Sequence, residues 1–106
     1  VVGQLLLVSD VERAEVKSLA VHQQRQGEGI GRLLVERAIA VCREEGRATL
    51  VVATAAADTR VLRFYQLLGF RLAHVERDAF TSENGYPAID VDGIPLRDRV
   101  WLSLDL

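Results

Sequence analysis

The stretch Gln26-Gly27-Glu28-Gly29-Ile30-Gly31-Arg32 determines how the rest of this 106-residue chain is interpreted. Its glycines stand at alternate positions and leave the backbone bare, so an anion can approach the N–H groups closely. A helix-like pattern follows, and the start of a helix offers unpaired N–H groups and a partial positive charge. The stretch therefore predicts a phosphate-binding turn, with Arg25 and Arg32 as cationic neighbours.

Two familiar nucleotide motifs fit this turn badly. A Walker loop ends in Gly-Lys-Ser/Thr, and no lysine follows these glycines. A dinucleotide turn is spaced Gly-x-Gly-x-x-Gly, whereas the spacing here is Gly-x-Gly-x-Gly. The alternative without a ligand is an ordinary flexible connection between a strand and a helix, but three glycines weaken a fold unless something needs the bare backbone.

The sequence on both sides of the turn predicts a strand–helix–strand unit with further strands around it, which is an α/β architecture. The predicted strands are 4–8, 14–21, 48–54, 70–75 and 99–104. The first predicted helix begins at Ile30 and is ended by Gly46 as its C′ residue, and the second extends through Leu68 with Asp58 or Thr59 as its N-cap. The first is expected to turn a common face inward, made of Ile30, Leu33, Leu34, Ala38, Val41 and Cys42. Turns are expected at residues 9–13, 84–85 and 92–93.

Composition limits the classes of function. Hydrophobic residues make up 49% and charged residues 26%, which is typical of a soluble globular domain. A formal net charge of −2 gives no basic surface for nucleic acid, and no apolar run is long enough to span a bilayer. Cys42 is the single cysteine and is expected to be a buried thiol in a reduced, cytoplasmic setting. His22 and His74 have no metal-ligand spacing, so no metal is expected.

The glycine turn resembles motif A of the GNAT acetyltransferases, Gln/Arg-x-x-Gly-x-Gly/Ala, through Gln26, Gly29 and Gly31. A second family feature follows at residues 64–70, where Phe-Tyr-Gln-Leu-Leu-Gly-Phe is similar to the family's FY-x-x-x-GF helix end. The tail at residues 92–102 also resembles that of some small bacterial members. The resemblance implies a single domain over residues 1–106 with the GNAT-like acyl-CoA N-acyltransferase fold, in which a mixed central sheet carries two main helices.

The resemblance also implies a binding site for acetyl-CoA as co-substrate. In the family, two central strands splay apart, and backbone groups of the first one pair with the pantetheine as an added strand would. The residues of this chain that the resemblance assigns to acetyl-CoA are Leu19, Ala20, Val21, Arg25, Gln26, Gly27, Glu28, Gly29, Ile30, Gly31, Arg32, Ala56 and Leu62. Many members carry Asn near Ala56, and alanine departs from that pattern because it offers no side-chain hydrogen bond.

Two residues are expected to be catalytic in direct transfer from the thioester to an amine. Tyr65 resembles the family's tyrosine that protonates the departing thiolate, and the alternative is that it only packs. Glu15 resembles the general-base glutamate of histone-type members, and the alternative is a solvated carboxylate. The function implied is an N-acetyltransferase acting on a primary amine of a small molecule or peptide. The alternative is a CoA-binding or regulatory module without turnover.

The chain begins almost at the family's third strand, so it is expected to lack the N-terminal strand–helix–helix–strand portion that roofs the acceptor pocket. An edge strand at residues 5–8 would then be unprotected, and we expect a second copy to cover it in a homodimer. The acidic loop 83–92 is expected either to attract a cationic amine or to be plain solvated charge. The sequence does not identify the acceptor.

Overall fold

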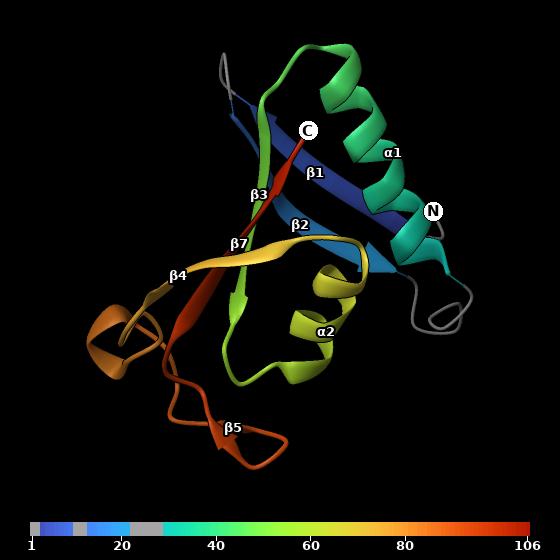
Figure 1. Cartoon of the computed structure of the whole chain (residues 1–106). Coiled ribbons are helices and arrows are strands. Elements are labelled where there is room, and N and C mark those ends of the chain that lie inside the picture. Colours follow the sequence, from blue (N-terminus) through green and yellow to red (C-terminus); the bar gives the residue numbers. More distant parts are fainter. Residues whose placement is uncertain (1–2, 10–12, 22–28) are drawn as a thin grey trace. The chain divides into compact units, whose positions relative to one another are not determined.

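The computed structural model describes residues 3–9, 13–21 and 29–106 (Figure 1). Its elements are β1 (Gly3–Ser9), β2 (Arg13–Val21), α1 (Ile30–Glu44), β3 (Thr49–Ala55), α2 (Thr59–Leu67), β4 (Arg71–Glu76), the 3-10 turn η2 (Ser82–Asn84), β5 (Asp90–Val91), β6 (Ile94–Pro95) and β7 (Arg99–Asp105). Every predicted strand and both helices are confirmed. Most of the turn predicted at 9–13 and of the glycine loop falls outside the described residues. The chain forms two compact units, residues 1–52 with 104–106, and residues 53–103.

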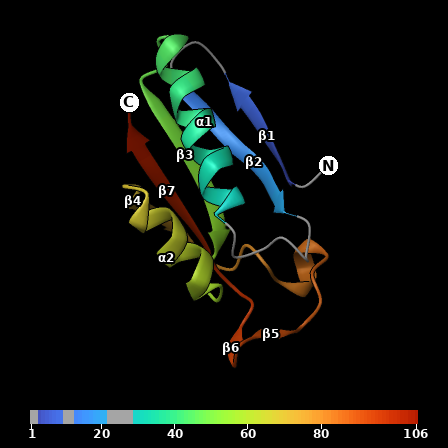
Figure 2. The ribbon, with the colours of Figure 1, turned by 90° about the vertical axis from the view of Figure 1, so that its right-hand side faces the viewer.

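The first unit is a mixed sheet covered by one helix. Its strand order is β1-β2-β3, in which β1 is antiparallel to β2 and β2 is parallel to β3. α1 contacts β1 and β2 and runs along one face of them (Figure 2). In β3, Leu50, Val51 and Val52 are buried in succession, as expected for a strand covered on both faces. β1 lies at the end of this strand order, so one of its edges pairs with no strand of the sheet. That a second copy of the chain covers this edge stays a prediction.

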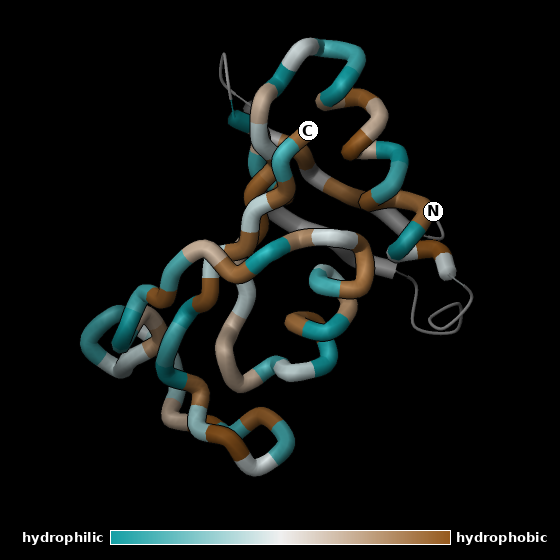
Figure 3. The backbone as a smooth tube through the Cα atoms, in the orientation of Figure 1, coloured by the Kyte–Doolittle hydropathy of each residue, from teal (hydrophilic) through white to brown (hydrophobic). Residues whose placement is uncertain are grey.

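The inward face of α1 differs from the predicted one. The buried residues are Val35, Ala38, Ile39 and Cys42, which have the i, i+3, i+4, i+7 spacing of one helical stripe. Leu33 was predicted to lie on that stripe and is instead 66% exposed. Residues 33–35 are all apolar, so composition alone does not say which of them faces the sheet. Along α1, hydrophobic (brown) and hydrophilic (teal) stretches alternate (Figure 3). The thiol of Cys42 is buried as predicted, and desolvation raises its pKa.

Gly46 ends α1 as predicted. Its φ of 75° is left-handed, a conformation that glycine adopts without steric cost. The Gly46 N–H donates to the Arg43 carbonyl at 3.1 Å, and the Arg47 N–H donates to the Cys42 carbonyl at 2.9 Å. This pair of bonds is the Schellman motif, and it satisfies carbonyls that a helix end otherwise leaves without a partner.

The second unit joins α2 to an antiparallel strand pair. Asp58 caps α2, since its carboxylate accepts from the Val61 N–H at 3.2 Å. β4 pairs with β7 and contacts α2. The hairpin β5–β6 was predicted only as a turn, and it closes through Asp92 and Gly93, whose φ values of 50° and 86° suit a type I′ turn.

A carboxylate ties β4 to β7. Glu76 accepts from the Trp101 indole N–H at 3.2 Å and from the Arg99 guanidinium at 3.2 Å. The hydrogen bond from Trp101, followed by the charge of Arg99, holds the pKa of Glu76 below its ordinary value of 4.5. His74 is exposed and stacks on Trp101 with ring centroids 5.8 Å apart.

The buried face of β7 predicts a large stability difference between two facing leucines. Leu102 is 0% exposed, whereas its cross-strand partner Leu72 on β4 is 59% exposed. We expect Leu102→Ala to lower the free energy of unfolding by about 2–5 kcal/mol, because it removes transfer energy and leaves a cavity. The matched control Leu72→Ala should cost less than about 1 kcal/mol. Equal losses in urea titrations of the two variants would contradict this assignment of the core.

The Glu76 contacts predict a pH transition in the fluorescence of Trp101, the single tryptophan. Since the folded-state pKa of Glu76 is lowered, its stabilisation is present above pH 4.5 and is lost as the pH falls through the lower folded value. Trp101 emission should therefore change with a midpoint below pH 4.5. Glu76→Gln should remove this transition; an unchanged transition in that variant would show that another group causes it.

Candidate functional site

Among the residues that the structure describes, the first backbone N–H groups of α1 have no side-chain cap. Gly29 is the N-cap residue, with φ 79° and ψ 10°, and no side chain caps this end. The first intrahelical bond runs from the Leu33 N–H to the Gly29 carbonyl at 3.0 Å. The N–H groups of residues 30–32 therefore precede the helical ladder, and no acidic residue lies in the first turn. Such a terminus suits an anion, because spare donors and the positive end of the helix dipole coincide there.

The structure brings Gly29, Ile30, Gly31 and Arg32 together at this terminus. The other predicted members of the turn, Arg25, Gln26, Gly27 and Glu28, lie outside the described residues. The Nε of Arg32 pairs with Glu36 Oε1 at 2.7 Å, with both side chains largely exposed. This pair holds the guanidinium against the helix and leaves its terminal N–H groups as donors.

The predicted pantetheine strand bends at a β-bulge. Leu6 pairs with Ser18 and Leu7 with Val16, so Lys17 is the extra residue on β2. The parallel ladder between β2 and β3 ends at Val16, immediately before the bulge, although β2 continues to Val21. Leu19, Ala20 and Val21 pair with β1 on one edge. A bulge bends its strand and interrupts pairing, which accounts for the end of the ladder and leaves residues 17–21 beyond it.

Tyr65 lies on the inward face of α2 among aromatic rings. It is 4% exposed and meets Phe64 and Phe70 edge to face, with ring centroids 5.0 and 5.3 Å away. Desolvation raises the pKa of its phenol above the ordinary 10. The hydroxyl therefore keeps its proton at neutral pH, which is the state that a proton donor needs.

Glu15 is the third residue of β2 in the first unit, whereas Tyr65 belongs to the second. Its backbone pairs with Val8 of β1 and Val51 of β3, and its side chain is half-buried. A partly desolvated carboxylate on a strand is a chemically reasonable proton acceptor.

The backbone amide of Ala56 is hydrogen-bonded within the protein. Its N–H donates to the Asp98 carbonyl at 2.8 Å. Since alanine has no polar side chain, Ala56 can meet a ligand only through its methyl group or its carbonyl. That Ala56 binds acetyl-CoA stays a prediction, and any contact would involve the methyl group or the carbonyl oxygen of this residue.

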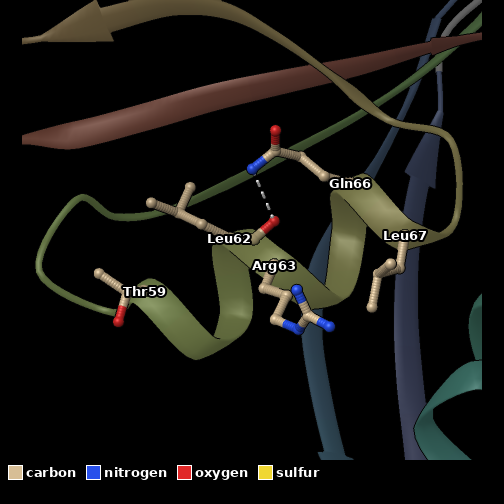
Figure 4. A pocket seen from close by; sticks show the side chains of 5 residues that line it. All are labelled: Thr59, Leu62, Arg63, Gln66 and Leu67. Carbon is tan, nitrogen blue, oxygen red and sulfur yellow. Dashed lines mark hydrogen bonds between the residues drawn. The ribbon is translucent and has the colours of Figure 1, made fainter.

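An open groove of about 450 Å³ lies along α2 (Figure 4). We call it the α2 groove, and its lining residues are Thr59, Leu62, Arg63, Gln66 and Leu67. Of these, only Leu62 was predicted as a site residue. The others share its helical face through i, i+3, i+4 spacing, a signal that was available in the sequence.

Two further properties concern only the residues that the structure describes. They contain no cluster of three or more His, Cys, Asp or Glu side chains placed to hold a metal ion. They also contain no helix of the length and apolarity needed to cross a membrane.

Sequence and structure comparisons identify the family. The Acetyltransferase (GNAT) family matches residues 1–70. The uncharacterized N-acetyltransferase YvbK of Bacillus subtilis (strain 168) is 31% identical over 102 residues, which cover 96% of this chain and 65% of that protein. This chain therefore spans slightly less than two thirds of that relative.

Solved structures of the family share this fold closely. A GNAT family acetyltransferase from Elizabethkingia anophelis with acetyl-CoA bound superposes with a TM-score of 0.92 at 30% identity, over 100% of this chain and 69% of that one. A Bacillus subtilis acetyltransferase in complex with CoA gives 0.91 at 31% identity, over 99% and 69%. The match to residues 1–70, together with this shared fold, shows that the chain belongs to the GNAT acetyltransferase family.

Proposed function

We propose that the protein transfers an acetyl group from acetyl-CoA to a primary amine of a small molecule or peptide by direct attack. The observation that carries this proposal is the open N-terminus of α1, where Gly29 is left-handed and the first turn has no acidic residue. Those backbone donors suit the diphosphate of coenzyme A. The acetyl-CoA and CoA present in the two structural relatives support the same ligand for this chain.

The reaction needs one base and one acid. The amine nitrogen must give up a proton to attack the thioester carbonyl, and the carbon–sulfur bond then breaks to release a thiolate that takes up a proton. We assign the acid to Tyr65, whose buried phenol is protonated at neutral pH. We assign the base to Glu15, which accepts the proton from the amine. Main-chain groups of Leu19 and Val21 are proposed to bind the pantetheine and to polarise the carbonyl.

A CoA-binding module without turnover is the second candidate. It is favoured by Ala56, whose N–H is already bonded to Asp98 and whose side chain offers no hydrogen bond. The two candidates separate in one assay, because an enzyme releases free thiol from acetyl-CoA in the presence of an amine panel. A cytoplasmic location and a homodimer remain part of the proposal.

Gly29 provides the test of the diphosphate site. Gly29→Asp places a carboxylate at the N-cap, where it repels a bound diphosphate while stabilising the helix. We expect the affinity for CoA to fall about 100-fold or more in calorimetry. This factor corresponds to roughly 3 kcal/mol of binding free energy, which is the loss expected when hydrogen bonds to a charged group are removed. Because the φ of 79° at Gly29 strains any side chain, the melting temperature should fall slightly, and by a similar amount in Gly29→Asp and Gly29→Asn.

Two controls isolate the charge in that experiment. Gly29→Asn carries the same backbone strain without the charge and should lose much less affinity. Gly46→Asn tests the strain alone at the other end of α1, where φ is 75° and no atom lies within 4 Å of an added Cβ. If Gly29→Asp binds CoA as tightly as Gly29→Asn, the anion does not bind at this turn.

Tyr65 provides the test of the acid. Tyr65→Phe removes one hydroxyl and keeps the ring contacts with Phe64 and Phe70. Turnover should fall by about 10²–10⁴-fold with CoA affinity nearly unchanged. Tyr86→Phe, on a half-exposed loop tyrosine, is the control and should retain activity. Full activity in Tyr65→Phe would assign proton donation to another group.

A further inference from the structure

β4 carries apolar side chains at a free edge of its sheet. It is the last strand in the strand order, and among the described residues only β7 pairs with it. Leu72 and Val75 of β4 are 59% and 57% exposed, whereas the residues that they pair with on β7, Leu102 and Val100, are buried. The apolar face of β7 therefore continues onto β4 and ends there in solvent, as at a surface that meets a partner.

A β-bulge decides which side chains of β4 share a face. The register with β7 shifts by one residue at Ala73. In a regular strand, residues an odd number of positions apart face opposite sides of the sheet. The extra residue instead brings Leu72 and Val75 to one face, and Arg71 and Glu76 to the other.

This pattern is complementary to a second β4 that runs antiparallel to the first. Directly opposed residues of an antiparallel pair lie on the same face, and the bulge makes this possible for an apolar pair and for a charged pair. Each pair occurs twice about a two-fold axis. In this register, the opposed residues of the two copies are Arg71 and Glu76, Leu72 and Val75, and Ala73 and His74.

The charges of β4 favour the same pairing. Charged residues and bulges often keep an edge strand single. The arginine and the glutamate of β4, however, stand at its opposite ends, so an antiparallel copy meets attraction at both. Arg71 makes no ion pair in the part of the chain that the structure describes. Glu76 bonds to Arg99 and Trp101, and a carboxylate has acceptor sites left for a further donor.

We propose that a second copy of this chain pairs with the outer edge of β4, so that the two β4–β7 ladders form one continuous sheet across a two-fold axis. This inference does not rest on acetyl transfer, and it places the second copy on an edge other than that of β1. Because β4 has only six residues, we expect a dimer that dissociates on dilution.

Sedimentation velocity of the 106-residue chain over a concentration series tests the interface. The wild type should show a monomer–dimer equilibrium. Arg71→Glu places a carboxylate opposite Glu76 at both ends of the interface, and it should raise the dissociation constant of the dimer about tenfold, because two attractive pairs become repulsive. Arg63→Glu, the matched control, makes the same charge change on an exposed residue of α2 and should keep the wild-type equilibrium.

A second variant and a mixing experiment separate the interface from general effects of charge. Leu72→Ser removes the apolar pair without changing the charge and should raise the dissociation constant about threefold or more. Glu76→Arg, with its folding checked by circular dichroism, should weaken the dimer as Arg71→Glu does. An equimolar mixture of these two charge variants should dimerise again, because opposite charges then meet at both ends.

Two results would overturn the inference. One is a wild-type chain that stays monomeric at every concentration. The other is a dimer whose dissociation constant is the same in the wild type, Arg71→Glu and Leu72→Ser, since the two copies then meet at another edge, such as that of β1.

Discussion

The first backbone amides of α1 precede its helical hydrogen bonds and receive no side-chain cap among the described residues, and the chemistry proposed for this chain depends on that arrangement. Gly29 turns the chain through a left-handed conformation, and no carboxylate lies in the first turn. The opposite end of the same helix is closed by the Schellman bonds of Gly46 and Arg47. α2 shows the contrast, since Asp58 caps its N-terminus and neutralises the donors that an anion would use. Of these two helix N-termini, the one that opens α1 is suited to a diphosphate.

The bulge at Lys17 supplies the second requirement, a strand edge that pairs with no protein strand. A regular β2 would continue its parallel ladder with β3 beyond Val16. One extra residue interrupts the pairing there and bends the strand, while the antiparallel ladder to β1 resumes at Ser18. The strand therefore keeps support from β1 along residues 18–21 while its ladder with β3 has ended. An extended ligand needs this arrangement, because it must add to a strand that stays ordered without its second neighbour.

The local signals of the sequence predicted the elements well. Turn and cap residues act through their own backbone or through a neighbour one turn away, so they could be predicted from short stretches of sequence. They are Gly29, Gly46, Asp58 before α2 and the Asp92-Gly93 pair. The inward face of α1 was harder to predict, because residues 33–35 are all apolar and packing against the sheet selects among them. The bond from Ala56 to Asp98 joins residues distant in the sequence, and no local pattern encodes it. Likewise, the α2 groove depends on which side chains stay exposed after packing, so the helix was predictable but only one of the groove residues was.

The two faces of α2 carry a buried phenol, that of Tyr65, and an exposed guanidinium, that of Arg63. Tyr65 points inward, where desolvation raises the pKa of its phenol and keeps the proton on the oxygen at neutral pH. A cation beside it would stabilise the phenolate and lower that pKa, which would weaken the case for an acid. The helical period places Arg63 on the other face, two residues and about 200° away around the axis. One short helix can in this way carry a neutral phenol toward the aromatic interior and a permanent positive charge on its exposed side, since burial keeps the phenol protonated and exposure permits the charge.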